Sequence, residues 1–200
     1  MNVKWSLDYN FISTTQKKGK STVVKQMRII HTSNFQDKER REIIGAIKSN
    51  IKDTILSILN AMERLNINFV VPNDEKLQNA KEYILEKVPA IDFKYVDIFW
   101  DHVELLWKDD GVKECASRGN EYHLMDSAQY FLDRVSSIRQ SNYLPDDQDI
   151  LRCRVLTRGI LETEFKVKHV RFHIFDVGKF IHSKCAVLAN NELMNEYWFA

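Results

Sequence analysis

The residues with the clearest chemical potential are four consecutive ones near the N-terminus, Gly19-Lys20-Ser21-Thr22. Apolar residues follow them with the spacing of one helical face, namely Val23, Val24, Met27 and Ile30. A loop that enters a helix in this way offers backbone N–H groups and a positive dipole end to a phosphate. In such a loop the lysine reaches the outer phosphates and the serine hydroxyl reaches Mg²⁺. The stretch therefore predicts the end of a phosphate-binding loop.

The same four residues also suit an ordinary basic helix start. The full phosphate-loop pattern, G-x-x-x-x-G-K-[ST], requires a glycine at the position where this chain has Thr14. The spacing alone leaves both interpretations open, so other parts of the chain must decide between them.

The composition of the chain excludes several classes of protein. Its 200 residues suffice for one domain or two small ones, and 44% apolar residues predict a folded core. A net charge of +1 argues against a nucleic-acid-binding protein. No apolar run is long enough to span a membrane, and Asn2 after Met1 excludes the N-myristoylation signal. Three scattered cysteines indicate a reducing, cytoplasmic compartment; they are Cys115, Cys153 and Cys185.

The elements that must position these residues are mostly helices. After the first helix, ending near residue 31, apolar periodicity predicts helices over 37–62, 75–87, 96–107 and 121–138, with a short helical piece ending at 117 and a turn-rich connection over 142–149. The period then changes to two over 163–168 and 170–174, which predicts an antiparallel hairpin. The chain is thus predicted to be α/β, with a long helical block between a loop–helix opening and a hairpin.

Four strings of this sequence carry a family resemblance: residues 19–31, 120–132, 147–157 and 175–178. The string Leu-Arg-Cys-Arg-Val-Leu-Thr at 151–157 is the most specific of them. Together they resemble the α subunit of a heterotrimeric G protein, most closely the stimulatory class that activates adenylyl cyclase. The resemblance covers about residues 19 to 178 and fails at both ends, as in a truncated and divergent copy.

The resemblance implies a domain organisation. Residues 1–34 would be part of a Ras-like domain, with a degenerate P-loop and the first helix. Residues 35–148 would be an inserted all-helical domain, and residues 149–178 would supply switch I and the β-hairpin of the Ras-like domain. Residues 179–200 would be an unrelated tail.

The resemblance also implies roles for single residues. Lys20 would bind the β- and γ-phosphates of GTP or GDP, and Ser21 and Thr157 would be the protein ligands of Mg²⁺. Arg154 would be the arginine that the family supplies in cis for catalysis. Asp176 would hold the ion through water. The complete implied nucleotide-binding set is Gly19, Lys20, Ser21, Thr22, Asp126, Ser127, Ile150, Leu151, Arg152, Cys153, Arg154, Val155, Leu156, Thr157, Asp176, Val177 and Gly178.

Each role has a plainer alternative when the residues are considered without the resemblance. Arg152 and Arg154 could be solvated charges on a connection, and Ser21 and Thr157 could be cap or turn residues. Asp126 and Ser127 could belong to the polar face of a helix, and Asp176 could be a turn residue. The aromatic residues of the helical block are predicted to form its core: Phe99, Trp100, Trp107, Tyr122, Tyr130 and Phe131.

The sequence departs from the family in both catalytic loops. Thr14 and Gln16 replace the first two glycines of the P-loop, where side chains hinder close approach to phosphate. Lys179 and Phe180 follow Gly178 where the family has Gly and Gln. That Gln orients the attacking water, which Phe cannot do. We also expect the chain to lack the family's lipid-carrying N-terminal helix, its guanine-recognition motif and its receptor-binding end.

Two functions remain as hypotheses. The first is a guanine-nucleotide-binding α subunit that hydrolyses GTP at a reduced rate and couples a receptor to adenylyl cyclase at the inner face of the plasma membrane. Its implied partners are the βγ dimer, a G-protein-coupled receptor and adenylyl cyclase. The alternative is a catalytically inactive fragment whose helical domain binds a partner protein. Whether the chain is an enzyme thus stays open.

Overall fold

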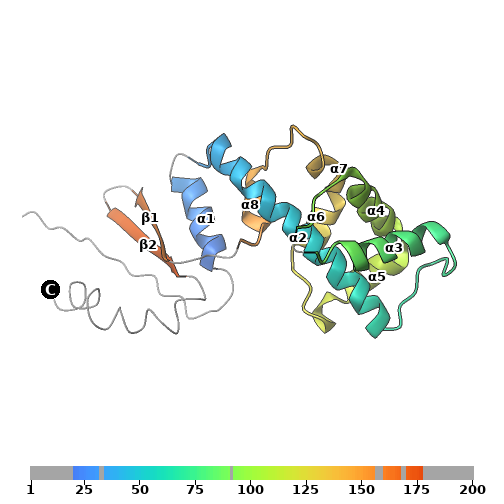
Figure 1. Ribbon diagram of the computed structural model, residues 1–200. Coiled ribbons are helices and arrows are strands. Elements are labelled where there is room, and N and C mark those ends of the chain that lie inside the picture. The colour runs from blue at the N-terminus through green and yellow to red at the C-terminus, as the bar shows by residue number, and fades with distance from the viewer. Residues whose placement is uncertain (1–19, 32–33, 91, 156–159, 168–169, 178–200) are drawn as a thin grey trace, which may run out of the picture. The chain divides into compact units, whose positions relative to one another are not determined.

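The structure, a computed structural model, describes residues 20–31, 34–90, 92–155, 160–167 and 170–177 (Figure 1). The chain divides into two compact units. Asp37–Arg154 forms the first, which we call the helical unit, and the segments before and after it form the second. The helical unit is therefore an insert in the chain of the other unit.

The helical unit is built around its longest helix, α2 (Asp37–Arg64). The chain continues through α3 (Glu75–Lys87), α4 (Asp97–Lys108), α5 (Asp110–Ser117), the 3₁₀ turn η1 (Gly119–Glu121), α6 (Ala128–Asp133), α7 (Val135–Ile138) and α8 (Asp147–Arg152). Helix α2 packs against α3, α5, α6 and α8, whereas α4 packs against α3, α5, α6 and α7 (Figure 1). None of the helices that the structure describes has the length and hydrophobicity needed to cross a lipid bilayer.

The core of the helical unit is an apolar stripe on α2 enclosed by aromatic residues. The stripe residues Ile47, Ile51, Ile55, Ile58 and Leu59 are fully buried. Phe99, Trp100 and Phe131 are buried against them, and Trp107, Tyr122 and Tyr130 pack on the core while partly exposed. Burying one such aliphatic side chain contributes about 1.5–3 kcal/mol. The predicted stripe and the predicted aromatic core are both confirmed.

Aspartate caps fix where two of these helices begin. Asp74 Oδ1 accepts hydrogen bonds from the N–H groups of Lys76 (2.8 Å) and Leu77 at the start of α3. Asp109 Oδ1 does the same for Gly111 (2.9 Å) and Val112 at the start of α5. The other oxygen of Asp109 accepts from Val70 N–H at 3.1 Å, which ties the loop before α3 to α5.

Two glycines of the helical unit should respond oppositely to alanine. A Cβ at Gly45, inside α2, would meet no atom within 4 Å, so Gly45→Ala should raise the free energy of unfolding by about 1 kcal/mol. A Cβ at Gly111 would lie 2.2 Å from the Asn68 carbonyl oxygen, so Gly111→Ala should lower it by about 1–3 kcal/mol. Urea titration of both variants measures this, and an unchanged stability in Gly111→Ala would contradict the packing at this site.

Two predicted segments of the helical unit are wrong. The helix expected over 121–138 is interrupted, because His123 has a positive φ of 60° and the chain turns before α6. The Tyr122 hydroxyl donates back to the Cys115 carbonyl at 3.0 Å, a tertiary contact that overrides helical periodicity. The connection expected over 142–149 contains the start of α8, which Asp146 begins with a reciprocal capping box. Residues 149–154 consequently belong to the helical unit, whereas the predicted boundary followed residue 148.

The first and last helices of the helical unit are joined by one arginine. The Arg40 guanidinium on α2 donates to the Pro145 carbonyl at 2.8 Å and to Asp147 Oδ1 of α8. We call this contact the Arg40 bridge. It holds the beginning of the insert against a segment near its end.

The other unit contains α1 (Lys20–His31), β1 (Ile160–Val167) and β2 (Val170–Val177). The strands pair antiparallel, with Phe165 opposite Phe172 and Leu161 opposite Asp176, and α1 lies against both. Within α1, Val24 is buried, whereas Val23 and Ile30 are exposed. The apolar face predicted for this helix is therefore wrong at those two positions, because the face of Val24 is the one that packs.

Candidate functional site

The unit built on α1 carries one part of the predicted site. Ser21 and Thr22 lie half-buried in the first turn of α1, directly after Lys20, where helix geometry favours an anion. Asp176 and Val177 are the last residues of β2. Gly19 and Gly178 lie outside the described residues. This unit thus places two hydroxyl side chains at one helix N-terminus.

The helical unit carries the remaining predicted residues in two places. Asp126 and Ser127 form the turn that precedes α6, where Asp126 is exposed and Ser127 is half-buried. The segment predicted as switch I begins in α8, which ends at Arg152. The Asp126–Ser127 turn leads into α6, which packs on α8 through Tyr130.

The burial of the predicted switch I residues divides them into two groups. Ile150 and Cys153 are buried and Leu151 is half-buried, so these side chains pack within the helical unit. Arg152, Arg154 and Val155 are exposed, and Leu156 and Thr157 lie outside the described residues. The cationic side chains of this segment are therefore the ones available to a ligand.

The two arginines, which residue spacing alone leaves equivalent, have different surroundings. The Arg152 guanidinium lies 4.6 Å from the centre of the Tyr130 ring, a cation–π contact. Arg154 follows the buried Cys153, and its backbone is bonded to the side chain of Asn50 on α2. Arg154 is thus anchored through its backbone while its side chain is exposed.

A buried carboxylate that sequence reasoning missed organises this region. Asp149 is fully buried and accepts hydrogen bonds from the hydroxyls of Tyr130 (2.9 Å) and Tyr143 (2.8 Å) and from Asp146 N–H (3.0 Å). Arg134 Nε lies 3.3 Å from its Oδ1. The pattern Asp146-x-x-Asp149 is a capping-box signature that could have indicated this position. The charge of Asp149 is compensated within the unit, so its role is to hold α6, α7 and α8 together.

The tyrosines around Asp149 predict how stability depends on pH. Burial, aided by the hydrogen bond to Asp149, raises the pKa of Tyr130 from 10.0 to about 12 and also raises the pKa of Tyr143. The folded state therefore keeps these protons at a pH where the unfolded state loses them. Their contribution to stability is complete below pH 10.0 and is lost as the pH rises from there toward about 12.

The measurement is the thermal midpoint of the full chain between pH 9 and 12. We expect the midpoint to decrease more steeply with pH in the parent than in Tyr130→Phe, because the variant has no Tyr130 hydroxyl to titrate. Lysine titration affects both chains alike and cancels in this comparison. Equal slopes would show that the Tyr130 hydroxyl does not contribute as described.

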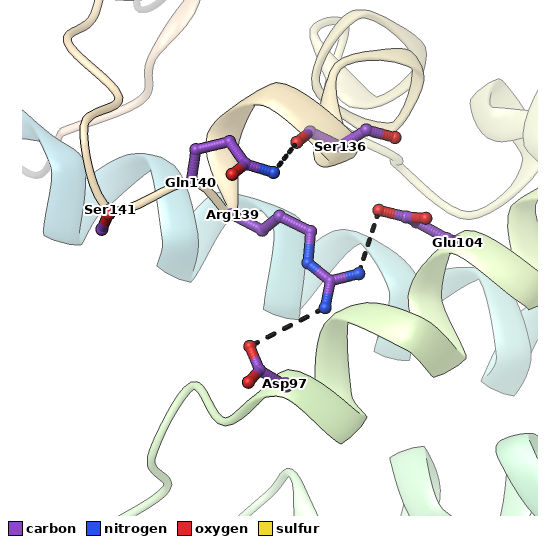
Figure 2. A pocket seen from close by; sticks show the side chains of 6 residues that line it. All are labelled: Asp97, Glu104, Ser136, Arg139, Gln140 and Ser141. Atoms are coloured by element: carbon purple, nitrogen blue, oxygen red, sulfur yellow. Dashed lines mark hydrogen bonds and ion pairs between the residues drawn. The ribbon is translucent and has the colours of Figure 1, made fainter.

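One hollow on the helical unit lies away from these residues. It measures about 550 Å³ and is lined by Asp97, Glu104, Ser136, Arg139, Gln140 and Ser141 (Figure 2). Arg139 already pairs with Asp101 at 2.7 Å and with Glu104 and Asp97 at 3.5 and 3.7 Å. These ion pairs hold α4 to α7, and none of the predicted site residues lines the hollow.

The predicted metal ligands suit Mg²⁺ by their chemistry. Mg²⁺ prefers hard oxygen ligands and keeps several waters, with substrate phosphates completing its shell. Ser21 supplies such an oxygen at the start of α1, and Thr157 would supply a second but lies outside the described residues. Among the residues that the structure describes, no group of three or more His, Cys, Asp or Glu side chains could hold an ion.

Comparison with known proteins identifies the family. A model described as "G-protein alpha subunit" matches residues 11–182. The chain is 52% identical over 160 residues to "Guanine nucleotide-binding protein G(s) subunit alpha" of Homarus americanus and 51% identical to that of Lymnaea stagnalis. It is 50% identical over 160 residues to "Guanine nucleotide-binding protein G(olf) subunit alpha" of Homo sapiens.

Each of these alignments covers 80% of this chain and 42% of the relative. The chain therefore spans about two fifths of the length of the relatives it matches. The relatives confirm the predicted resemblance to the stimulatory class, and they favour the α-subunit hypothesis over that of a protein-binding fragment. The chain belongs to the G-protein alpha subunit family.

Proposed function

We propose that this chain is a guanine-nucleotide-binding α subunit that binds GDP and GTP with Mg²⁺ and hydrolyses GTP. The observation that carries the proposal is the family match over residues 11–182, which spans the α1 motif, the helical unit and the strands. The names of the relatives, which describe guanine nucleotide-binding subunits, support it. The protein-binding alternative has no comparable support.

The proposed roles follow the arrangement within each unit. The α1 end contributes Lys20 and Ser21 to the phosphates and Mg²⁺, within a partial Ras-like domain that also contains β1 and β2. The helical unit contributes the Asp126–Ser127 turn and the exposed Arg154. Phosphoryl transfer depends mainly on positioning and charge neutralisation, so the lysine, the arginine and a divalent cation would have to converge on the terminal phosphate.

We further propose the partners and the cellular place that the stimulatory class implies. These are a βγ dimer, a G-protein-coupled receptor and adenylyl cyclase, at the inner face of the plasma membrane. The identity to G(s) and G(olf) subunits over most of this chain supports this class. Because Phe180 replaces the glutamine that orients water in the family, we expect slow hydrolysis.

Nucleotide binding by the purified chain tests the proposal. We expect saturable binding of a fluorescent GDP or non-hydrolysable GTP analogue that strengthens with Mg²⁺ and is lost in Lys20→Ala. Lys87→Ala, which removes an exposed lysine from the end of α3, is the matched control and should bind as the parent does. Absence of binding up to about 1 mM nucleotide, an affinity of only ~4 kcal/mol, would refute the proposed function.

A further inference from the structure

An asparagine in the middle of α2 contacts a residue 104 positions later in the chain. Asn50 is only 6% exposed. Its Nδ2 donates to the Ala46 carbonyl at 2.7 Å and to the Arg154 carbonyl at 3.0 Å. Its Oδ1 accepts from the Arg154 N–H at 2.9 Å. Both amide hydrogens and the amide oxygen of Asn50 are therefore used.

This geometry fixes the backbone of Arg154 from two directions. A side chain that accepts from the N–H and donates to the C=O of one residue acts on it as a neighbouring β-strand would. The residue before it is fixed as well, because Cys153 is buried and its N–H donates to the Asp149 carbonyl at 2.8 Å. The backbone of Arg154 is thus held to the rigid core of the helical unit.

The position of Asn50 indicates that its hydrogen bonds to Arg154 do more than contribute to packing. Asn50 lies on the buried face of α2 that carries Ile47 and Ile51, where an apolar residue would pack without any polar partner. Arg154 is itself exposed, so water could satisfy its backbone groups. Burying the Asn50 amide costs desolvation free energy, and its hydrogen bonds in turn fix the position of the Arg154 backbone.

We propose that Asn50 is a positioning residue for Arg154 in GTP hydrolysis. It fixes the point from which the Arg154 side chain extends, so that the guanidinium meets the terminal phosphate without a search over backbone conformations. This inference rests on the proposed function, since it assigns Asn50 a role in the same reaction. It adds a buried residue of α2, acting through the backbone of Arg154, to the determinants of the rate.

Single-turnover GTP hydrolysis by the full chain tests the proposal. Asn50→Leu should reduce the rate by about 10–100-fold, because small misplacements of a charged group cost this much, while nucleotide affinity stays within about twofold of the parent value. Asn50→Asp keeps the size and the acceptor for Arg154 N–H but loses both donors, so its rate should lie between that of the parent and that of Asn50→Leu. Asn60→Leu is the control, because Asn60 Nδ2 also donates to a carbonyl four residues earlier, at 2.7 Å, but is exposed.

A double variant separates positioning from general destabilisation. In an Arg154→Ala background, Asn50→Leu should have no further effect on the rate, because the group that it positions is gone. Hydrogen exchange provides a second measurement that needs no nucleotide. The Arg154 amide should lose protection at least about tenfold in Asn50→Leu and keep it in Asn60→Leu.

The outcomes distinguish this proposal from the proposed function. Parent-like hydrolysis in Asn50→Leu, or an equal loss of rate with and without Arg154, would overturn the role of Asn50 while leaving the GTPase assignment intact. A parent chain that binds no nucleotide would refute the proposed function, and the role of Asn50 would fall with it. If Asn50→Leu does not fold, Asn50→Asp decides by the same criteria.

Discussion

Replacing Asp149 with alanine is expected to lower the free energy of unfolding of the chain by about 3–4 kcal/mol. Two tyrosine hydroxyls and the Asp146 N–H would lose their acceptor inside the helical unit. Each hydrogen bond to a charged group contributes about 1.5–3 kcal/mol net, but both tyrosines are half-buried, so water would replace part of what they lose. Arg134 would also lose a partner, but its side chain is 37% exposed and keeps Asp146, so its share of the loss is small.

Two further variants refine this expectation. Asp149→Asn preserves the shape and one oxygen but turns the other acceptor into a donor, so about half of the loss should remain. Asp146→Ala removes the cap of α8 together with the exposed ion pair to Arg134, and should cost about 1 kcal/mol, mostly from the cap. Urea titration monitored by far-UV circular dichroism measures all three, and a loss below 1 kcal/mol in Asp149→Ala would mean that Asp149 does not organise α6, α7 and α8.

Replacing Arg154 with alanine is expected to reduce the single-turnover rate of GTP hydrolysis by about 100-fold or more, with little change in nucleotide affinity. Negative charge moves between the oxygens of the transferred phosphate and those of the leaving group in the transition state, and one preorganised donor to such charge contributes about this much. The Arg154 side chain is exposed, so its removal should leave the stability of the chain unchanged.

Arg154→Lys and Arg118→Ala are the informative comparisons. Lysine keeps the charge but lacks the planar fork that contacts two oxygens at once, so only part of the rate should return. Arg118 is another arginine of the helical unit, bonded to Glu121 at 2.6 Å, and its replacement should not affect hydrolysis. Excess chain over GTP makes even a slow parent rate measurable, and an Arg154→Ala rate within threefold of it would remove Arg154 from the mechanism.

The sequence predicted the helices best where several local signals coincide. Helix α3 has its expected bounds because Asp74 caps its start, apolar residues keep the helical period and Pro89 follows its end. The segment over 121–138 has the same period but breaks at residues 122–127. There the Leu124 N–H bonds to the Gly119 carbonyl at 2.8 Å instead of continuing a helix. Periodicity reports which side chains are apolar but does not report this competition between backbone partners.

The candidate site could be predicted only through its resemblance to a family. Ser21, Asp126, Arg154 and Asp176 are far apart in the sequence, and no spacing rule relates them. Asn50 was missed for a related reason, since an amide within an apolar stripe gives no indication of a partner 104 residues away. Asp149 was closer to detection, because its capping-box partner Asp146 is only three residues before it.

The insertion of one unit within the other has a consequence for biosynthesis. The residues of α1 leave the ribosome before the whole Asp37–Arg154 segment, whereas β1 and β2, against which α1 lies, leave after it. At about 5–20 residues per second, α1 waits many seconds for its strands. During that time the helical unit can fold, and the Arg40 bridge then brings the start of the insert to a segment near its end. Closing a flexible loop of the length of the Asp37–Arg154 segment would cost on the order of 4 kcal/mol in chain entropy. If the insert is already folded when the strands emerge, α1 and the strands can associate without this cost.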